Sequence, residues 1–510
     1  MQIVWFRRDL RLKDNEIVSK ATQDRRETLP CFIVDPWFYQ QQVAVPRVKF
    51  LFESLENLDA NLRERGSQLY LFEGESVAII QAITRSLLQT DIRPKLYFNR
   101  DVQLPYGINR DRAILDFYRQ HNLATHIGLN HFLQSSEDYR TLWRDYHDYQ
   151  QQPLYSAPAE INTPQLTLNL PQLTIAELKQ KYHRFLSAQS YLYRGGEYNA
   201  QGTLNSFVAH RYQGYHWKMS RPWMAQQGAT SHLSAHLVFG TISSRNVYQS
   251  IIELEPKIDQ AKHKFSLKTF RDRLRWHDKF SQRHYFHPEL AFKNRYPEFD
   301  EWYSAEILTG EKQELFEAWC AGKTGFPLVD ASMRQLNTIG WMNFRLRAMC
   351  VTFLCINCGV SWHHGASYFM SRLVDGDIAI NHWQWQAQAG VTNPMSKTFR
   401  IYNPTKNLQD KDPQLQFVRY WIPELKPYSL KELLAAEYSA TNNYPQPILD
   451  LKQTRKVNGK VVADLRKKVR VRLEQEGGEE YQQAVGASKT VEKYMVVKDK
   501  QYQAMKSSPK

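Results

Sequence analysis

The sequence predicts an α/β domain with a doubly wound, Rossmann-like parallel sheet, followed by an all-helical domain. Within residues 1–130, short buried strand-like runs alternate with helical patterns. Residues 131–195 lose that alternation, and residues 196–465 are helical in pattern and rich in aromatic side chains. A chain of 510 residues is also too long for one ordinary core. We therefore expect two domains joined by a connector at 131–195.

The first domain repeats one unit, a strand followed by a helix. Its strand-like runs lie at 3–6, 31–34, 69–72 and 96–98, and its helical patterns at 47–64, 77–88 and 109–121. Such repetition indicates a parallel sheet with helices on both faces.

The rest of the chain predicts a connector, a set of helices and a tail. Four prolines mark the connector as a surface crossing. Helices are expected at 202–212, 231–239, 244–254, 266–280, 313–321, 327–339, 343–358 and 365–373. Residues 466–510 lack apolar periodicity after about 473 and carry many basic side chains, so we expect a flexible basic tail there.

Composition narrows the class of protein. The net charge of +15 indicates a polyanion binder or a protein with basic solvated faces. Five cysteines are too few for a disulfide framework. No apolar run is long enough for a membrane helix, and the N-terminus enters a strand without a signal sequence. We expect a cytoplasmic protein that does not bind a membrane.

Three cysteines have a spacing that resembles iron–sulfur ligation. Cys350, Cys355 and Cys358 fall inside the predicted helix at 343–358. Buried apolar thiols are the favoured interpretation, so no metal site is predicted.

Hydroxyl groups gather where the helix at 231–239 begins. Thr230, Ser231 and Ser234, together with the free N–H groups of a first helical turn, suit a pyrophosphate. An ordinary helix N-cap is the alternative.

A second polar group lies at 375–381. Asp375, Asp377 and Asn381 could line a polar heterocycle or form a loop with Asx turns. Arg347 could pair with one carboxylate, because a lone buried charge is costly. Trp362, Trp383 and Trp385 could relay electrons or belong to the core.

Taken together, these segments resemble the DNA photolyase/cryptochrome family. The resemblance covers about 450 residues, in the order expected for the family. It rests on the segments at 4–15, 230–234, 322–336, 340–342, 375–381, 400–404, 421–425 and 444–448.

The resemblance implies that the α/β domain is an antenna domain and that the helical domain holds FAD. Arg347 and Asp375 would pair beside the isoalloxazine, Asp377 would meet its polar edge, and Asn381 would face flavin N5. The implied cofactor-binding residues are Thr230, Ser231, Leu233, Ser234, Phe270, Arg347, Asp375, Asp377 and Asn381.

The resemblance also implies a substrate and a reaction. Light-excited reduced FAD would give an electron to a cyclobutane pyrimidine dimer flipped out of UV-damaged DNA, single- or double-stranded, and a monomer would suffice. Trp276 and Trp383 would line the lesion cavity. The implied catalytic residues are Trp276, Arg273, Asn381, Trp383 and Trp362.

The lesion side departs from the family pattern. Arg273 stands where a glutamate usually meets the thymine, His277 replaces an arginine, and Phe344 replaces an asparagine. The paired histidines of (6-4) photolyases are missing at Asn343 and Phe344, which argues against that reaction.

The electron relay and the antenna also depart from the pattern. Trp383 and Trp362 match the first two relay positions, but Thr309 stands at the third. Trp302, Tyr303 or Trp319 are the candidate substitutes. The loop at 99–106 lacks the glutamate that would hold a folate, so a second chromophore would be of another kind, or absent.

Three functions therefore compete. The first is light-driven repair of cyclobutane pyrimidine dimers. The second is a cryptochrome-like blue-light photoreceptor in which the basic tail moves to signal. The third is a nucleic-acid binder that keeps flavin for stability without repairing DNA.

Overall fold

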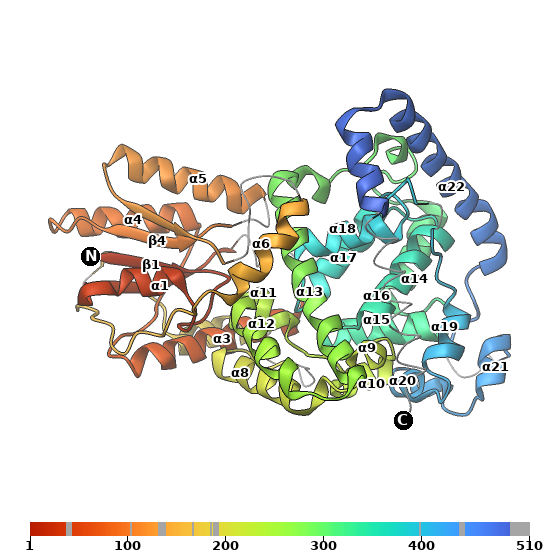
Figure 1. Cartoon of the computed structure of the whole chain (residues 1–510), viewed down its shortest axis with the longest axis horizontal. Helices are drawn as coiled ribbons and strands as arrows, with labels where there is room; N and C mark the ends of the chain where they lie inside the picture. Colours follow the sequence, from red (N-terminus) through yellow and green to blue (C-terminus); the bar gives the residue numbers. More distant parts are fainter. Residues whose placement is uncertain are drawn as a thin grey trace.

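The chain folds into an α/β domain and a larger helical domain that lie side by side (Figure 1). The computed structural model describes residues 1–36, 43–101, 105–130, 139–165, 168–183, 186, 193–396, 399–437 and 444–489.

Five parallel strands form the sheet of the first domain, in the order β3-β2-β1-β4-β5. The strands are β1 (Gln2–Phe6), β2 (Thr28–Val34), β3 (Tyr70–Glu73), β4 (Lys95–Asn99) and β5 (Thr125–Gly128). The predicted parallel sheet is thus confirmed. Sequence patterns missed β5, because its residues are mostly half-buried and form no apolar run.

Helices cover both faces of the sheet. Val4 and Phe6 of β1 pack in the same apolar cluster as the buried side chains of α1 (Glu16–Ala21) and α3 (Val45–Arg63). Ile3 and Trp5 point to the other face and pack with α4 (Ser76–Leu88) and α5 (Pro105–Gln120). Alternate side chains of one strand therefore serve two cores, which is typical of a doubly wound sheet.

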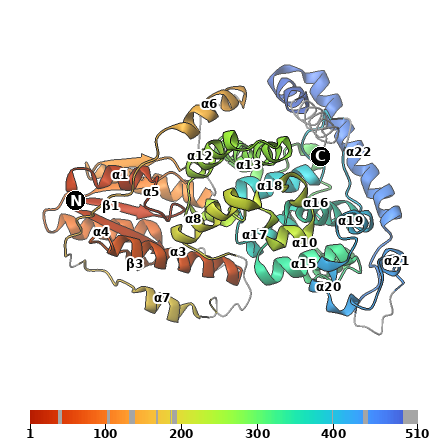
Figure 2. The same ribbon diagram turned by 60° about the horizontal axis from the view of Figure 1, so that its bottom comes forward.

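The predicted connector holds two helices. α6 (Tyr139–Gln151) contacts α12 (Ser244–Leu254) and α13 (Ala261–Phe286) of the helical domain. α7 (Ile175–Lys181) begins with a capping box between Thr174 and Glu177. The two helices lie on opposite sides of the molecule (Figure 2).

The second domain is helical, as predicted. α12 (Ser244–Leu254) and α15 (Pro327–Ile339) have the predicted bounds. The long helix expected at 343–358 is α16 (Phe344–Thr352) followed by a π-helical turn. The other helices are α8 (Glu197–Ser206), α9 (Tyr215–Lys218), α10 (Pro222–Met224), α11 (Ser234–Phe239), α13 (Ala261–Phe286), α14 (Gly310–Ala321), α17 (Trp362–Arg372), α18 (Ile378–Gln388), α19 (Pro404–Lys411), α20 (Gln416–Trp421), α21 (Leu430–Ala435) and α22 (Leu451–Glu476).

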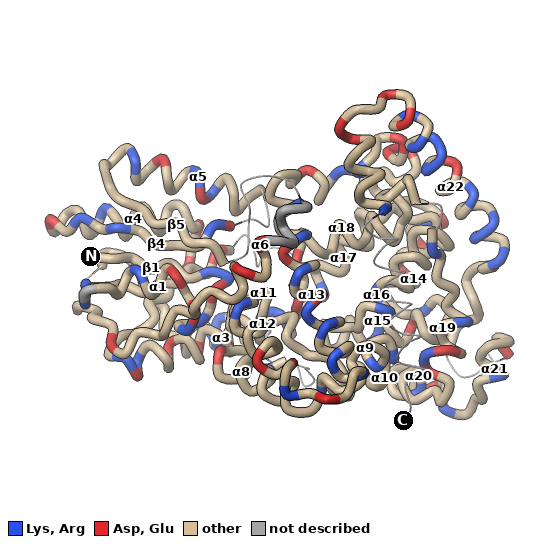
Figure 3. Tube along the Cα trace, in the orientation of Figure 1, with Lys and Arg blue, Asp and Glu red and all other residues tan. Residues whose placement is uncertain are grey.

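The sequence predicted a flexible tail from residue 466, but most of the described part of that tail is helical. α22 continues to Glu476, and residues 478–489 are also helical. Val469 and Leu473 are buried, which ties this region to the helical core. The many basic residues along α22, visible in Figure 3, dilute its apolar periodicity in the sequence. Residues 490–510 lie outside the described part of the chain.

Within the described ranges, no single helix is long and apolar enough to cross a membrane. α15 and the helical run at 344–357 pass such a test only as a pair, and they are bent by 120°.

The three closely spaced cysteines are core residues. Cys350, Cys355 and Cys358 are buried free thiols, and loss of solvation raises the pKa of each. A thiol whose pKa is raised is a poor metal ligand, because the ligand is the thiolate.

Candidate flavin and lesion site

An ion pair stands where α16 meets the segment between α17 and α18. Arg347 Nη2 donates to both carboxylate oxygens of Asp375, at 2.8 and 2.9 Å. Arg347 Nε donates to the Met342 carbonyl at 2.9 Å, which fixes the guanidinium plane. The Asp375 side chain is only 5% exposed. The structure thus brings together the pair that the sequence predicted.

The neighbouring carboxylate, Asp377, opens α18. Its Oδ1 accepts from the Ile380 amide at 3.2 Å as an N-cap, and its Oδ2 pairs with Arg8 at 3.2 Å. Asn381, one turn further on, donates from Nδ2 to the Ala366 carbonyl at 3.0 Å. Arg8 belongs to the α/β domain, so this edge of the site is closed by both domains.

The hydroxyl-rich segment runs from Gly228 to the start of α11. Arg211 donates to the carbonyls of Gly228, Thr230 and Ser231, which fixes the carbonyl side of the segment. Gly228 has a φ of +95°, a backbone conformation that glycine adopts without strain.

One hydroxyl of this segment has no partner. Among the described residues, the buried Thr230 Oγ1 makes no hydrogen bond. A buried hydroxyl without a partner is costly, and a phosphate oxygen would satisfy it. The residues present therefore fit the pyrophosphate of FAD.

Tyr193 connects the two parts of the site. Its hydroxyl lies 3.1 Å from Ser234 Oγ. Burial raises the pKa of Tyr193, the charge of Asp375 raises it further, and Arg347 opposes that effect. Ser234 and the Arg347–Asp375 pair therefore both lie close to this one phenol. Sequence reasoning missed Tyr193, because it lies in the connector, where no pattern marked it.

Two of the predicted cofactor residues pack in the apolar core next to the hydroxyl-rich segment. Leu233 and Phe270 are buried in one apolar cluster. The Phe270 ring packs against Phe207 at 4.6 Å and Tyr215 at 5.6 Å. This packing shows core contacts for both side chains, so any contact with FAD stays a prediction.

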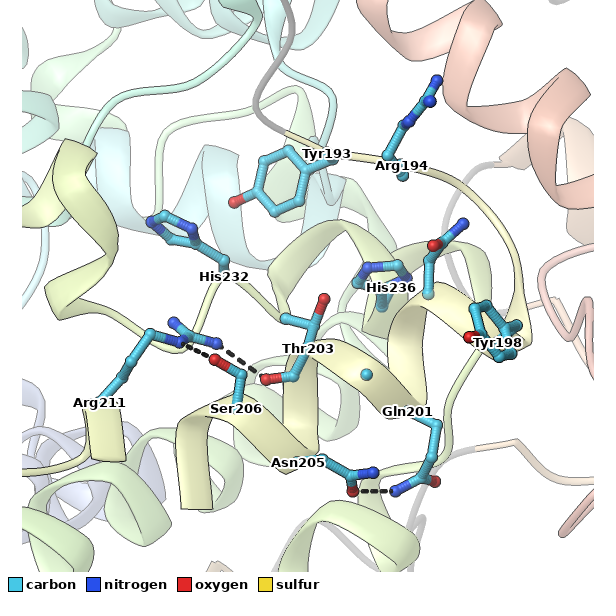
Figure 4. A pocket seen from close by; sticks show the side chains of 12 residues that line it. Tyr193, Arg194, Tyr198, Gln201, Thr203, Asn205, Ser206, Arg211, His232 and His236 are labelled. Carbon is cyan, nitrogen blue, oxygen red and sulfur yellow. Dashed lines mark hydrogen bonds between the residues drawn. The ribbon is translucent and has the colours of Figure 1, made fainter. Parts of the chain in front are cut away.

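A cavity of about 520 Å³ opens beside α8 (Figure 4). Its lining includes Tyr193, Arg211, His232 and His236, but none of the predicted cofactor residues. Burial lowers the pKa of His232 to about 4 and of His236 to about 3, so both are neutral at pH 7. This cavity is therefore lined by other residues than the predicted flavin contacts, but it adjoins them through Tyr193, Arg211 and His232.

The lesion-side residues follow one face of α13. The Arg273 guanidinium lies over the Phe344 ring, 5.3 Å from its centre. The Trp276 ring packs on Phe280 at 5.8 Å, with Lys279 Nζ 4.7 Å from its centre. Positions 273, 276 and 280 are neighbours on a helix, so the structure brings the predicted Arg273 and Trp276 together with Phe280 on one face of α13.

His277 places this face of α13 beside Asp377. Desolvation lowers the pKa of His277, but the hydrogen bond that its Nδ1 donates to Asp278 Oδ1 at 3.1 Å and the charges of Asp278 and Asp377 outweigh it, so the pKa is raised. In agreement, α13 packs against α18, whose N-cap is Asp377.

A cluster of cations lies next to Phe344. Arg345 donates to the Tyr402 hydroxyl at 2.7 Å, and burial, Arg400 and Arg273 lower its pKa. Lys411 has a pKa lowered by burial first, and then by Arg345 and Arg221. In the part of the chain that the structure describes, Arg221, Arg273, Arg345 and Arg400 form no salt bridge. Sequence reasoning singled out only Arg273 of this cluster.

The two tryptophans predicted to relay electrons, Trp383 and Trp362, contact different residues. The Arg283 guanidinium lies 3.7 Å from the centre of the Trp383 ring. Trp362 is buried, stacks on His363 at 3.8 Å and donates to Asn294 Oδ1 at 2.7 Å. Their role as a relay stays a prediction.

Trp319, one of the three candidate substitutes, contacts Trp385, which the sequence also offered as a relay residue. Its ring contacts Trp385 at 6.0 Å, and Trp385 also packs on Phe369 at 4.9 Å. Trp385 lies one helical turn after Asn381 on α18.

The domain order and the site chemistry define a class, a flavoprotein with an α/β domain before a helical FAD-binding domain. The family model for DNA photolyase matches residues 2–150, and the model for the FAD binding domain of DNA photolyase matches residues 270–464. The two models together match more than half of the chain. The protein belongs to the DNA photolyase/cryptochrome family.

Relatives from both branches of the family match nearly the whole chain. Deoxyribodipyrimidine photo-lyase of Synechococcus sp. is 28% identical over 473 residues, covering 88% of this chain and 93% of the relative. Cryptochrome DASH of Gloeobacter violaceus is 28% identical and covers 89% of this chain and 94% of the relative.

Solved structures of photolyases have a fold similar to that of this chain. The class III photolyase from Agrobacterium tumefaciens has a TM-score of 0.76 and 26% identity, covering 91% of this chain and 98% of its own. The archaeal photolyase from Sulfolobus tokodaii, crystallised with two FAD molecules, has a TM-score of 0.73 and 27% identity, covering 92% and 100%.

Proposed function

We propose that this protein is a DNA photolyase that splits cyclobutane pyrimidine dimers. The observation that supports this most is the proximity of two groups of residues. The helix α13, which carries the aromatic and cationic face, packs against α18. The N-cap of α18 is Asp377, two residues after Asp375 of the ion pair that fits a flavin. A lesion held on Trp276 would then be close to the cofactor.

The cofactor end of the site has three tasks. Thr230 donates its free hydroxyl to a phosphate, and the Arg347–Asp375 pair presents a fixed charge pattern to the flavin ring. Asn381 offers an amide at the position proposed for N5. When bound, reduced FAD supplies the electron that light promotes.

The lesion end holds the damaged bases. Trp276 gives the flipped dimer a flat surface for stacking, and Arg273 donates to a thymine carbonyl where the family usually has a glutamate. Arg345, Arg400 and Lys411 hold the flanking phosphates, because no carboxylate pairs with the two arginines among the described residues.

A cryptochrome-like photoreceptor is the second candidate. Arg273 and Phe344 replace residues that repair enzymes use, and a cryptochrome DASH is among the relatives. The basic tail after about residue 473, which was the expected signalling segment, is less suited to that role. Its described part continues α22 to Glu476 and is helical again over residues 478–489.

A second chromophore is part of the proposal, at the carboxyl edge of the sheet. Asn99 donates to Asp9 at 2.6 Å there, and Arg7 pairs with Asp111 at 2.5 Å. Ligands of open parallel sheets bind at this edge, and the Sulfolobus tokodaii photolyase contains a second FAD. We also propose that the protein acts as a monomer in the cytoplasm.

Repair and signalling separate in one experiment. The protein with reduced FAD is illuminated with a single-stranded oligonucleotide that contains one thymine dimer, and intact thymines are counted by chromatography. A photolyase restores them in the light and not in the dark. Normal photoreduction of FAD with no loss of dimer would favour the photoreceptor.

A further inference from the structure

We infer that α22 carries a second DNA-binding surface, apart from the lesion cavity. The surface is the cationic stripe, formed by Lys452, Lys456, Lys460, Lys467 and Arg470. The four lysines are exposed and the arginine is half-buried. Figure 3 shows basic residues along α22 at the edge of the helical domain.

The five cations lie on one side of the helix. At about 100° per residue, they fall within an arc of roughly 80°. The 18 steps from Lys452 to Arg470 correspond to a straight stripe of about 27 Å at 1.5 Å per residue. Consecutive phosphates of one DNA strand are spaced by about 3.4 Å along the axis, so the stripe spans roughly eight of them.

The opposite side anchors the helix. Val462, Val469 and Leu473 are fully buried. Arg466 donates to the carbonyls of Gly390 and Thr392 at 2.7 and 2.9 Å. The stripe is therefore presented on a fixed helix, and binding requires little ordering of the backbone.

The stripe's charges are not neutralised within the protein. No salt bridge involves any of the five side chains in the described part of the chain, whereas Arg472, just beyond them, pairs with Glu298 at 2.6 Å. Asp464 is the one acidic residue between Lys452 and Arg470.

Helix stability does not explain this pattern. Lysines four residues apart repel one another, and cations near a helix N-terminus, such as Lys452, oppose the helix dipole. An external polyanion would relieve both effects. The match to the family model of the FAD-binding domain ends at residue 464. Lys467 and Arg470 of the stripe therefore lie beyond the matched region.

DNA is the polyanion we assign to it, and only this choice rests on the proposed function. The stripe offers little apolar surface for insertion into a lipid bilayer, because Val462, Val469 and Leu473 are buried in the protein and the exposed apolar side chains of α22 are two separate valines, Val457 and Val471. It would hold undamaged backbone beside the lesion and contribute affinity without sequence or lesion preference.

The test measures binding of undamaged duplex DNA at several salt concentrations. The stripe variant is K452Q/K456Q/K460Q. The matched control, K20Q/K257Q/K431Q, removes the same charge from exposed lysines elsewhere. The stripe variant should lower the slope of log K against log salt by about 2 to 3, and the control by less than about 1. Folding of each variant is checked by its thermal unfolding midpoint.

Two results would overturn the inference. One is an equal slope in the stripe variant and the wild type. The other is a slope change of the same size in the control. Binding to anionic phosphatidylserine vesicles that depends on the stripe, with no change for DNA, would assign it to membranes instead. Dimer repair at saturating DNA should be unaffected by the stripe variant, so a failure of repair in the wild type is a separate outcome.

Discussion

Arg347 and Asp375 form a two-bond ion pair, with one guanidinium nitrogen donating to both carboxylate oxygens at 2.8 and 2.9 Å. Asp375 is nearly fully buried, while Arg347 keeps some contact with solvent. Removing one partner leaves a largely buried charge unpaired. We expect Asp375→Asn to lower the free energy of unfolding by roughly 2 kcal/mol and to reduce the flavin retained on purification.

Urea unfolding and the ratio of flavin to protein absorbance measure these two effects. Glu56→Gln is the control, since it breaks an exposed pair with Lys179 and should cost less than about 1 kcal/mol. Equal losses in the two variants would contradict the importance of the buried pair.

Thr230→Val tests the unpaired hydroxyl. The variant removes a buried polar group without a partner, so the flavin-free protein should be as stable as the wild type or more so. The affinity for FAD should fall about tenfold, as expected for one lost hydrogen bond to a charged group. Flavin titration measures this. Thr338→Val, which removes a hydroxyl bonded to its own helix, should leave FAD affinity unchanged.

Trp276→Ala tests the stacking surface. Loss of one base–aromatic stack should weaken binding of a thymine-dimer oligonucleotide by about 1–3 kcal/mol and leave FAD content unchanged. The control is Trp217→Ala, another partly exposed tryptophan, which lies on α9. If the two variants bind the dimer equally well, Trp276 does not stack on the lesion.

Lys279 makes the free energy of unfolding depend on pH. Burial, and then Arg283, lower its pKa to about 7, whereas an unfolded lysine titrates near pH 10.4. Between these values the unfolded state binds the additional proton, so the free energy of unfolding rises with pH. The free-energy cost of burying this amine is fully present below about pH 7 and disappears above pH 10.4.

Lys279→Met should therefore stabilise the protein more at pH 7 than at pH 10, in urea unfolding at both values. Lys20→Met, at an exposed lysine, should show the same small effect at both. A benefit of Lys279→Met that is independent of pH would contradict the lowered pKa.

The sequence predicted the parallel sheet and most of the helices because strand and helix periodicities are local properties. It failed where burial does not follow a pattern. β5 has no apolar run, and basic residues mask the buried positions of α22. A helix held by tertiary contacts, such as those of Arg466, cannot be recognised from local charge.

The residues of the site also fall into those that the sequence could predict and those that it could not. The Arg347–Asp375 pair was predictable, because a buried charge requires a partner. Tyr193, Arg8 and Lys411 were not, because each reaches the site from a distant segment through tertiary packing. The unpaired state of Thr230 Oγ1 also depends on its surroundings in the fold.

The most direct test of the proposed function is an action spectrum of dimer splitting. Thymine-dimer DNA and the protein with reduced FAD are illuminated at a series of wavelengths, and restored thymines are counted at each. We expect splitting that follows the absorption of the reduced flavin and disappears when FAD is removed. Protein that binds the dimer and keeps its FAD, yet splits none at any wavelength, would contradict it.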